Sequence, residues 1–264
     1  MSLIATAVAD AADGQHPAFD KAFELSLGGQ YVVADANVSA VVAPLPETGI
    51  DLDDMGIDDE ATVFYAAARW RFAERWAATL TYNEFDQSGA TEVSDTFNFD
   101  GVVYPAGARL NSQLQLNAYI LDVAYSFGKA SNYEWGAGLG LHALDLAAEL
   151  DANLFIGQSE IVLSQAADSL LAPVPNVRVF ADYAFNHRNI LRFNAGWLSA
   201  DYEDYSGSLI YASLRLEHAF NDSIGAGIGA QYTGLDLRND PGGRSRQEYD
   251  AELLGVMGFL TYRF

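Results

Sequence analysis

The sequence predicts a single antiparallel transmembrane β-barrel of about ten strands, with eight or twelve strands as the alternatives. Polar and apolar residues alternate with a period of two from residue 22 onward, and short and long connections take turns along the chain. One face of most strands is also apolar enough to meet lipid. A membrane-spanning helix would need about 20 consecutive apolar residues, and the sequence has no such run.

Ten segments of alternating polarity, bounded by turn residues, define the expected strands. They are residues 22–35, 62–72, 76–86, 110–127, 133–149, 175–186, 190–202, 208–220, 224–237 and 249–264. An even number of antiparallel strands brings both ends of the chain to the same side of the membrane. Residues 21–264 are expected to form one barrel domain, because no low-complexity linker divides them.

The connections between these strands fall into a short and a long class that alternate in order. The short ones are 73–75, 128–132, 186–189 and 221–223, and the longer ones are 36–61, 87–109, 150–174, 203–207 and 238–248. This arrangement is typical of short periplasmic turns and long extracellular loops. The first long loop is rich in Asp and Glu and has no Lys or Arg, and its segment 49–55 is expected to form one or two helical turns.

Composition excludes several kinds of partner. The 36 acidic and 14 basic residues give a formal charge of −22, which repels nucleic acid. The absence of Cys excludes disulfides and Cys-ligated metals, and no cofactor is expected. Residues 1–20 carry small residues at a cleavage-like position, so they are interpreted as a residual signal peptide or a disordered tail outside the fold.

Aromatic residues gather beside the short turns. Because Trp, Tyr and Phe favour membrane interfaces, these residues are expected to form an aromatic girdle on the periplasmic side. The predicted girdle consists of Phe72, Trp76, Phe127, Phe185 and Phe220.

The opposite face of the strands carries charge and should line the lumen. The predicted lumenal residues are Glu24, Arg69, Arg71, Asp122, His142, Arg178, Asp182, Arg192, Arg215 and Glu217. Two interpretations stay open: a network of ion pairs that fills the interior, or opposed charges at a constriction that selects small solutes or ions. Since barrels of about eight strands are filled by side chains, ten strands favour a narrow lumen over a wide porin.

The last strand carries a specific resemblance. Leu260, Tyr262 and Phe264 alternate up to the end of the chain, and Gly258 lies one position from the usual place of a glycine. This pattern resembles the C-terminal assembly signal of outer-membrane barrels. The resemblance implies that the barrel-assembly machinery recognises these residues during insertion.

A second resemblance covers most of residues 22–149. It rests on Gly49-Ile-Asp-Leu-Asp-Asp-Met-Gly-Ile-Asp58, Arg69-Trp-Arg-Phe72, Tyr125-Ser-Phe127 and Gly136-Ala-Gly-Leu-Gly-Leu-His142. These segments are similar to a group of proteobacterial outer-membrane proteins of uncharacterised role. The resemblance implies residence in the cell outer membrane of a Gram-negative bacterium, in contact with its lipid and lipopolysaccharide, and it transfers no catalytic residue.

We therefore expect a structural barrel, or one that passes small solutes or ions through a narrow pore. The alternative is an outer-membrane enzyme, a protease or a lipid-modifying enzyme, with a site at the lumen or the external rim. Catalysis would need a His near a Ser or an Asp; His142 alone faces the lumen, and no Ser motif accompanies it. The acidic segment 51–60 is expected to be a solvated loop, with Ca²⁺-bridged contact to lipopolysaccharide as the weaker alternative.

Overall fold

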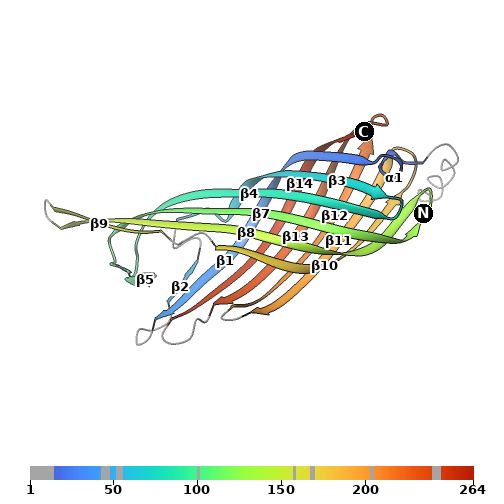
Figure 1. Ribbon diagram of the computed structural model, residues 1–264. Coiled ribbons are helices and arrows are strands. Elements are labelled where there is room, and N and C mark those ends of the chain that lie inside the picture. Colours follow the sequence, from blue (N-terminus) through green and yellow to red (C-terminus); the bar gives the residue numbers. More distant parts are fainter. Residues whose placement is uncertain are drawn as a thin grey trace, which may run out of the picture.

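The predicted ten-stranded barrel is confirmed. The computed structural model describes residues 15–42, 48–51, 56–99, 102–156, 159–166, 170–202, 205–239 and 245–264. The barrel strands are β1 (Phe23–Val42), β3 (Glu60–Ala73), β4 (Trp76–Glu92), β7 (Arg109–Lys129), β8 (Tyr133–Ile156), β10 (Leu170–Ala184), β11 (Asn189–Tyr202), β12 (Tyr205–Ala219), β13 (Ile224–Asn239) and β14 (Ser245–Arg263). Each strand pairs antiparallel with the next, and β14 pairs with β1 to close the barrel (Figure 1).

The two-residue period sets which side chains meet lipid. On β3, Phe64 and Trp70 are exposed, whereas Val63 and Tyr65 are buried inside. The same alternation runs along β14, where Leu260 is exposed on the outer face and Phe259 is buried in the lumen. Because side chains alternate across a strand, the barrel has an apolar exterior and a mixed interior, which is the pattern of a transmembrane barrel.

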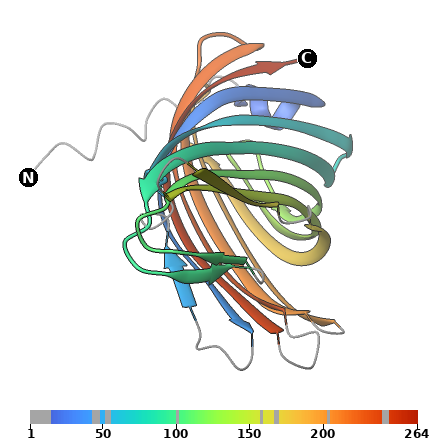
Figure 2. The ribbon, with the colours of Figure 1, turned by 90° about the vertical axis from the view of Figure 1, so that its left-hand side faces the viewer.

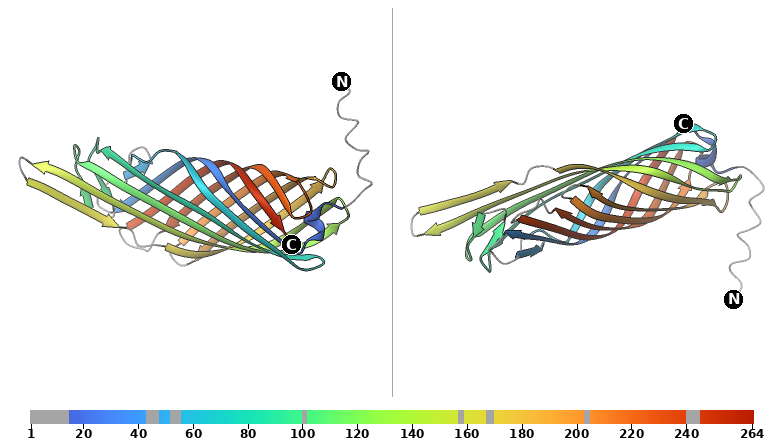
Figure 3. Two further views of the ribbon diagram at one scale, coloured as in Figure 1. Left: turned by 90° about the horizontal axis from the view of Figure 1, so that it is seen from above. Right: turned by 60° about the horizontal axis from the view of Figure 1, so that its bottom comes forward.

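The strands extend further at the long-loop end than the sequence predicts. Short strands that the sequence analysis left as loop add to them: β2 (Thr48–Asp51) pairs with β1, β9 (Ser159–Ala166) pairs with β8, and β5 (Phe97–Phe99) pairs with β6 (Val102–Tyr104). Figure 3 shows β8 and β9 projecting beyond the other strands. Strand edges present unpaired N–H and C=O groups, and these additional strands satisfy part of them.

The helical turns expected at residues 49–55 are wrong where the structure describes that segment. Residues 49–51 belong to β2, and Ile50 pairs with Val38 of β1. Residues 52–55 lie outside the described residues. The long outer end of β1 has a backbone edge. Residues 48–51 pair with this edge as a strand instead of forming the expected helical turns.

A short helix lies at the end of the barrel where the C-terminus is found (Figure 1). In α1 (Pro17–Asp20) the side chain of His16 accepts a hydrogen bond from the Ala18 N–H, and Phe19 is only 2% exposed because it packs on Ala184 and Ile190. Residues 16–20 therefore belong to the folded base, although the sequence-based boundary excluded them. Their signal was missed because a single helical turn has no period; residues 1–14 lie outside the described residues.

No helix among the described residues is both long and apolar enough to span a membrane.

Candidate functional site

The half of the lumen nearest the short turns is crossed by paired charges. At its centre Arg192 on β11 donates two hydrogen bonds to the carboxylate of Glu24 on β1, at 2.5 and 2.8 Å. Arg263 on β14 donates from Nε to Glu24 at 2.8 Å and also pairs with Glu217 on β12. Two-pronged contacts of this kind are the strong form of charge-assisted hydrogen bond, so four strands are joined across the barrel.

A second cluster adjoins the first on the other wall. Arg71 on β3 donates to both oxygens of Glu134 on β8 at 2.7 Å each, and Ser126 donates a further hydrogen bond to the same carboxylate. Arg69 lies 3.6 Å from Glu134 and 3.7 Å from Asp182 of β10. We call the two clusters together the base layer: Glu24, Arg69, Arg71, Glu134, Asp182, Arg192, Glu217 and Arg263.

Polar side chains continue toward the middle of the barrel. Arg178 on β10 donates to Asp122 on β7 at 2.9 Å and to Asn194 on β11. His142 on β8 is 3% exposed, and its Nε2 lies 2.5 Å from the side-chain nitrogen of Asn176. The ring of Tyr211 stacks obliquely on His142 with centroids 5.6 Å apart. These contacts satisfy part of the buried polar atoms, whereas Asp122 Oδ1, Asn176 Oδ1 and Arg178 Nε have no hydrogen-bond partner among the described residues.

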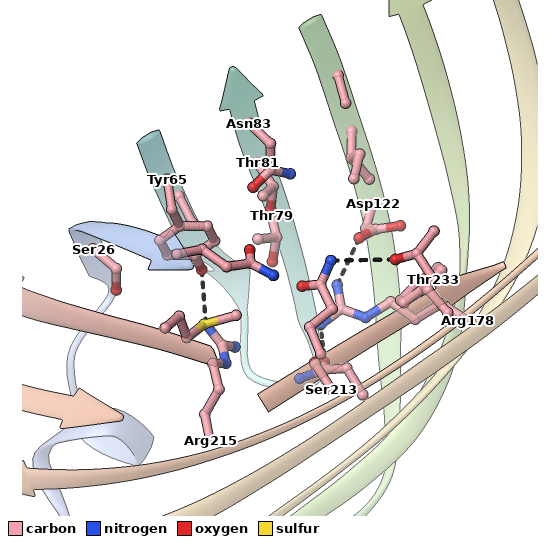
Figure 4. A pocket seen from close by; sticks show the side chains of 18 of the residues that line it. Ser26, Tyr65, Thr79, Thr81, Asn83, Asp122, Arg178, Ser213, Arg215 and Thr233 are labelled. Atoms are coloured by element: carbon pink, nitrogen blue, oxygen red, sulfur yellow. Dashed lines mark hydrogen bonds and ion pairs between the residues drawn. The ribbon is translucent and has the colours of Figure 1, made fainter. Parts of the chain in front are cut away.

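A cavity of about 220 Å³ lies between the base layer and the outer mouth. Its floor includes Glu24, Arg69 and Arg192. Its outer part is ringed by apolar side chains that we call the apolar collar: Val32, Val63, Phe85, Leu209, Leu235 and Leu253. Figure 4 shows side chains from opposite walls pointing into this space, with Tyr65 and Arg215 on one side and Asp122 and Arg178 on the other. The lumen thus has a charged floor and an apolar rim.

All ten side chains that the sequence placed in the lumen are buried or half-buried there. Each of them touches another polar lumenal side chain. Glu24, Asp182 and Glu217 are carboxylate acceptors of the base layer, together with Glu134. Glu134 and Arg263, both fully buried, were not among the lumenal residues predicted from the sequence. The alternation along each strand could have predicted both as lumenal, because Glu134 lies on the same face of its strand as His142, and Arg263 lies between two outward-facing residues.

The predicted girdle residues lie on the outer face beside the short turns. Phe72, Trp76, Phe127, Phe185 and Phe220 are each at least 42% exposed. Phe72 stacks on Trp76 with ring centroids 6.4 Å apart. At the end of the chain, Phe264 stacks on Phe23 of β1 at 5.3 Å, and the backbones of these two residues exchange two hydrogen bonds.

Among the described residues, no group of three or more His, Asp or Glu side chains could hold a metal ion. Asp53 and Asp54 lie outside those residues, and Asp58, Asp59 and Glu60 are exposed.

The closed sheet, its apolar exterior and its filled base define a transmembrane β-barrel protein. No protein-family model and no curated protein matches the chain. Among solved structures, the outer membrane protein OprG from Pseudomonas aeruginosa has 13% identity and a TM-score of 0.43, with 97% of this chain and 99% of that chain covered. The toluene transporter TodX from P. putida has 10% identity and a TM-score of 0.36, with 92% and 90% covered.

The outer membrane protease OmpT from Escherichia coli is similar over 91% of this chain and 97% of its own, with a TM-score of 0.55 and 8% identity. At that identity the likeness concerns the fold. The chain therefore has the fold of an outer-membrane β-barrel.

Proposed function

We propose that the protein is an integral barrel of the Gram-negative outer membrane, closed at its periplasmic end and holding a cavity for small solutes. The apolar exterior and the fold shared with an outer-membrane barrel support this location. Lipid and lipopolysaccharide are then its immediate surroundings. The observation that carries the closed state is the base layer, in which charges from β1, β3, β8, β10, β11, β12 and β14 meet across the lumen.

The pairing of these charges favours a filled interior over an open constriction. In a selective pore, charged rings face water and remain accessible to the permeating solute. Here Glu134, Glu217 and Arg263 are fully buried and α1 covers the same end. Small solutes reach the cavity from the outer mouth, and passage onward requires the base layer to rearrange.

Conductance of single barrels in planar lipid bilayers tests this proposal. We expect the wild-type protein to show no steady open level. The double variant Arg69→Ser and Arg192→Ser removes two large guanidinium groups from the cavity floor, so it should open measurable conductance. The control Arg109→Ser and Arg238→Ser removes equal charge from exposed positions at the outer ends of β7 and β13, and it should stay closed. A stable open pore in the wild type would overturn the closed base.

The alternative is an outer-membrane enzyme, a protease or a lipid-modifying enzyme, and the fold shared with OmpT favours it. His142 is the lumenal base that such chemistry would use, and it contacts Asn176 and Tyr211. We expect His142→Gln to leave peptide and phospholipid hydrolysis by the purified protein at the level of the wild type. A specific loss of either activity in this variant would support the enzyme instead.

We also propose that Leu260, Tyr262 and Phe264 form the segment recognised during barrel assembly. Their side chains lie exposed on the outer face of β14, between 50% and 64% exposed, so a partner can reach them before β14 pairs with β1.

A further inference from the structure

Among the described residues, the lumen holds one arginine more than it holds carboxylates. Six arginines, Arg69, Arg71, Arg178, Arg192, Arg215 and Arg263, face five carboxylates, Glu24, Asp122, Glu134, Asp182 and Glu217. Five of the arginines lie 3.6 Å or closer to a carboxylate oxygen. Arg215 differs, because in the described part of the chain no ion pair joins it to Asp or Glu.

Arg215 instead contacts neutral groups beside the cavity. Its Nη1 donates a hydrogen bond to the Tyr65 hydroxyl at 2.8 Å, and its guanidinium carbon lies 5.8 Å from the ring centroid of Phe259. Gly229 on the next strand leaves room for its stem, since a Cβ there would lie 2.8 Å from Arg215 Cγ. Figure 4 shows the side chain reaching from the wall toward Tyr65, with the cavity between this pair and Asp122. The remaining guanidinium donors are therefore available to the cavity.

An unpaired cation in a half-buried site is costly unless an anion joins it. Arginine matches a carboxylate through two parallel hydrogen bonds. Met257 lies next to Arg215 and the apolar collar lies farther out, and polar side chains such as Asn83, Gln231 and Thr233 also line the cavity. An apolar cavity of about 150 Å³ can hold benzene, so a cavity of about 220 Å³ has room for one aromatic ring and a carboxylate.

We infer that the lumenal cavity binds a small carboxylate with an apolar body, with its carboxylate on Arg215 and its body toward the collar. This inference rests on the proposed function in one respect, which is that small solutes reach the cavity from the outer mouth. Asp122 does not oppose the anion at that place, because it lies on the other wall and is paired with Arg178. The net charge of the chain slows entry of anions, but the acidic loops are screened beyond about 8 Å at physiological salt.

Fluorine NMR of 4-fluorobenzoate tests the inference, with the protein in a neutral detergent and empty micelles as the blank. The matched neutral probe is 4-fluorobenzyl alcohol. We expect the wild type to bind both probes. Arg215→Met keeps the length and apolar character of the stem but removes the charge, so it should weaken 4-fluorobenzoate binding by about tenfold or more. Binding of the alcohol should stay within about twofold.

Two further variants separate anion binding from a structural role of Arg215. Arg238→Met removes an arginine from the outer surface of β13, where it is half exposed and lies 3.7 Å from Asp236, and it should bind 4-fluorobenzoate as the wild type does. Tyr65→Phe frees the donor that Tyr65 occupies, so it should bind 4-fluorobenzoate at least as tightly. Each variant is first shown to be folded by its heat-modifiable migration on gels.

Equal binding of 4-fluorobenzoate by the wild type and Arg215→Met would overturn the inference, as would binding of the alcohol alone or of neither probe. These outcomes are independent of bilayer conductance. An open wild-type pore that still binds 4-fluorobenzoate through Arg215 would overturn the closed base and leave the carboxylate site standing.

Discussion

Arg192 and Glu24 are 168 residues apart in sequence and are joined across the base of the barrel by two hydrogen bonds of 2.5 and 2.8 Å. Glu24 also accepts a hydrogen bond from Arg263 at 2.8 Å. One carboxylate on the first strand thus neutralises guanidinium groups from β11 and β14. This arrangement makes the consequences of removing either partner unequal.

We expect Glu24→Gln to lower the free energy of unfolding by about 3–5 kcal/mol, because it leaves two buried arginines close together with the single carboxylate of Glu217 between them. Arg192→Met should cost less, since Glu24 keeps Arg263. Urea unfolding in lipid vesicles measures both. The exposed pair of Arg238 and Asp236 provides the control: Arg238→Met should change stability by less than about 1 kcal/mol. Equal costs for Glu24→Gln and Arg192→Met would contradict the shared role of Glu24.

Docking of α1 should depend on pH through His16. Burial, together with the positive charges of Arg192 and Arg263, lowers the pKa of His16 from 6.5 to about 4. A released His16 therefore binds a proton more readily than the docked one between these two values. The docked state has its full stability above pH 6.5 and loses up to about 1.4 kcal/mol per pH unit as the pH falls toward 4.

Hydrogen exchange of residues 16–21, corrected for the intrinsic effect of pH, measures this release at pH 7 and pH 4.5. The wild type should lose protection at the lower pH. His16→Asn keeps a side-chain acceptor for the Ala18 N–H but cannot titrate in this range, so it should keep its protection. The same loss in both proteins would show that another group controls the helix.

Two glycines on opposite faces of the barrel should respond differently to Ala. At Gly196 a Cβ would lie 2.3 Å from the ring of Tyr211, so Gly196→Ala should displace that ring from His142 and cost about 1–3 kcal/mol. At Gly258, which faces lipid, a Cβ would meet nothing within 4 Å, so Gly258→Ala should stay within about 0.5 kcal/mol. Urea midpoints of the two variants compare them directly. A larger loss of stability for Gly258→Ala than for Gly196→Ala would mean that another group occupies the space outside Gly258.

The sequence predicted the barrel because alternation is a local property that each strand shows by itself. Phe64 and Tyr65 are assigned to lipid and lumen by parity alone, and the structure agrees. The partners of the lumenal charges were beyond reach, because they depend on strand order and on the stagger between strands. Arg71 meets Glu134, 63 residues away, and nothing near either residue indicates the other.

The base helix and the outer strands escaped the sequence analysis for a different reason. Phe19 and Ile50 depend on surfaces that exist only after the barrel forms. Phe19 packs on Ala184 and Ile190, and Ile50 pairs with the backbone edge of β1. The sequence also did not indicate that Arg215, among the described residues, has no carboxylate partner. This becomes visible only when all six lumenal arginines are placed against their carboxylates.

Phe264 allows the assembly signal to be separated from simple interfacial stability. Its ring stacks on Phe23 of β1 at 5.3 Å, whereas Phe220, at the same end of the barrel, packs on His218 of β12 at 5.4 Å. Both rings are well exposed, at 60% and 57%.

If the C-terminal residues are recognised during insertion, Phe264→Ala should lower the yield of folded protein in the outer membrane several-fold in cells. Phe220→Ala should leave that yield nearly unchanged. Both variants, refolded from urea into detergent without any machinery, should reach similar stability, because each loses one exposed ring. An equal loss of yield for the two variants in cells would contradict a role of Phe264 in assembly and would leave it a role in the aromatic girdle only.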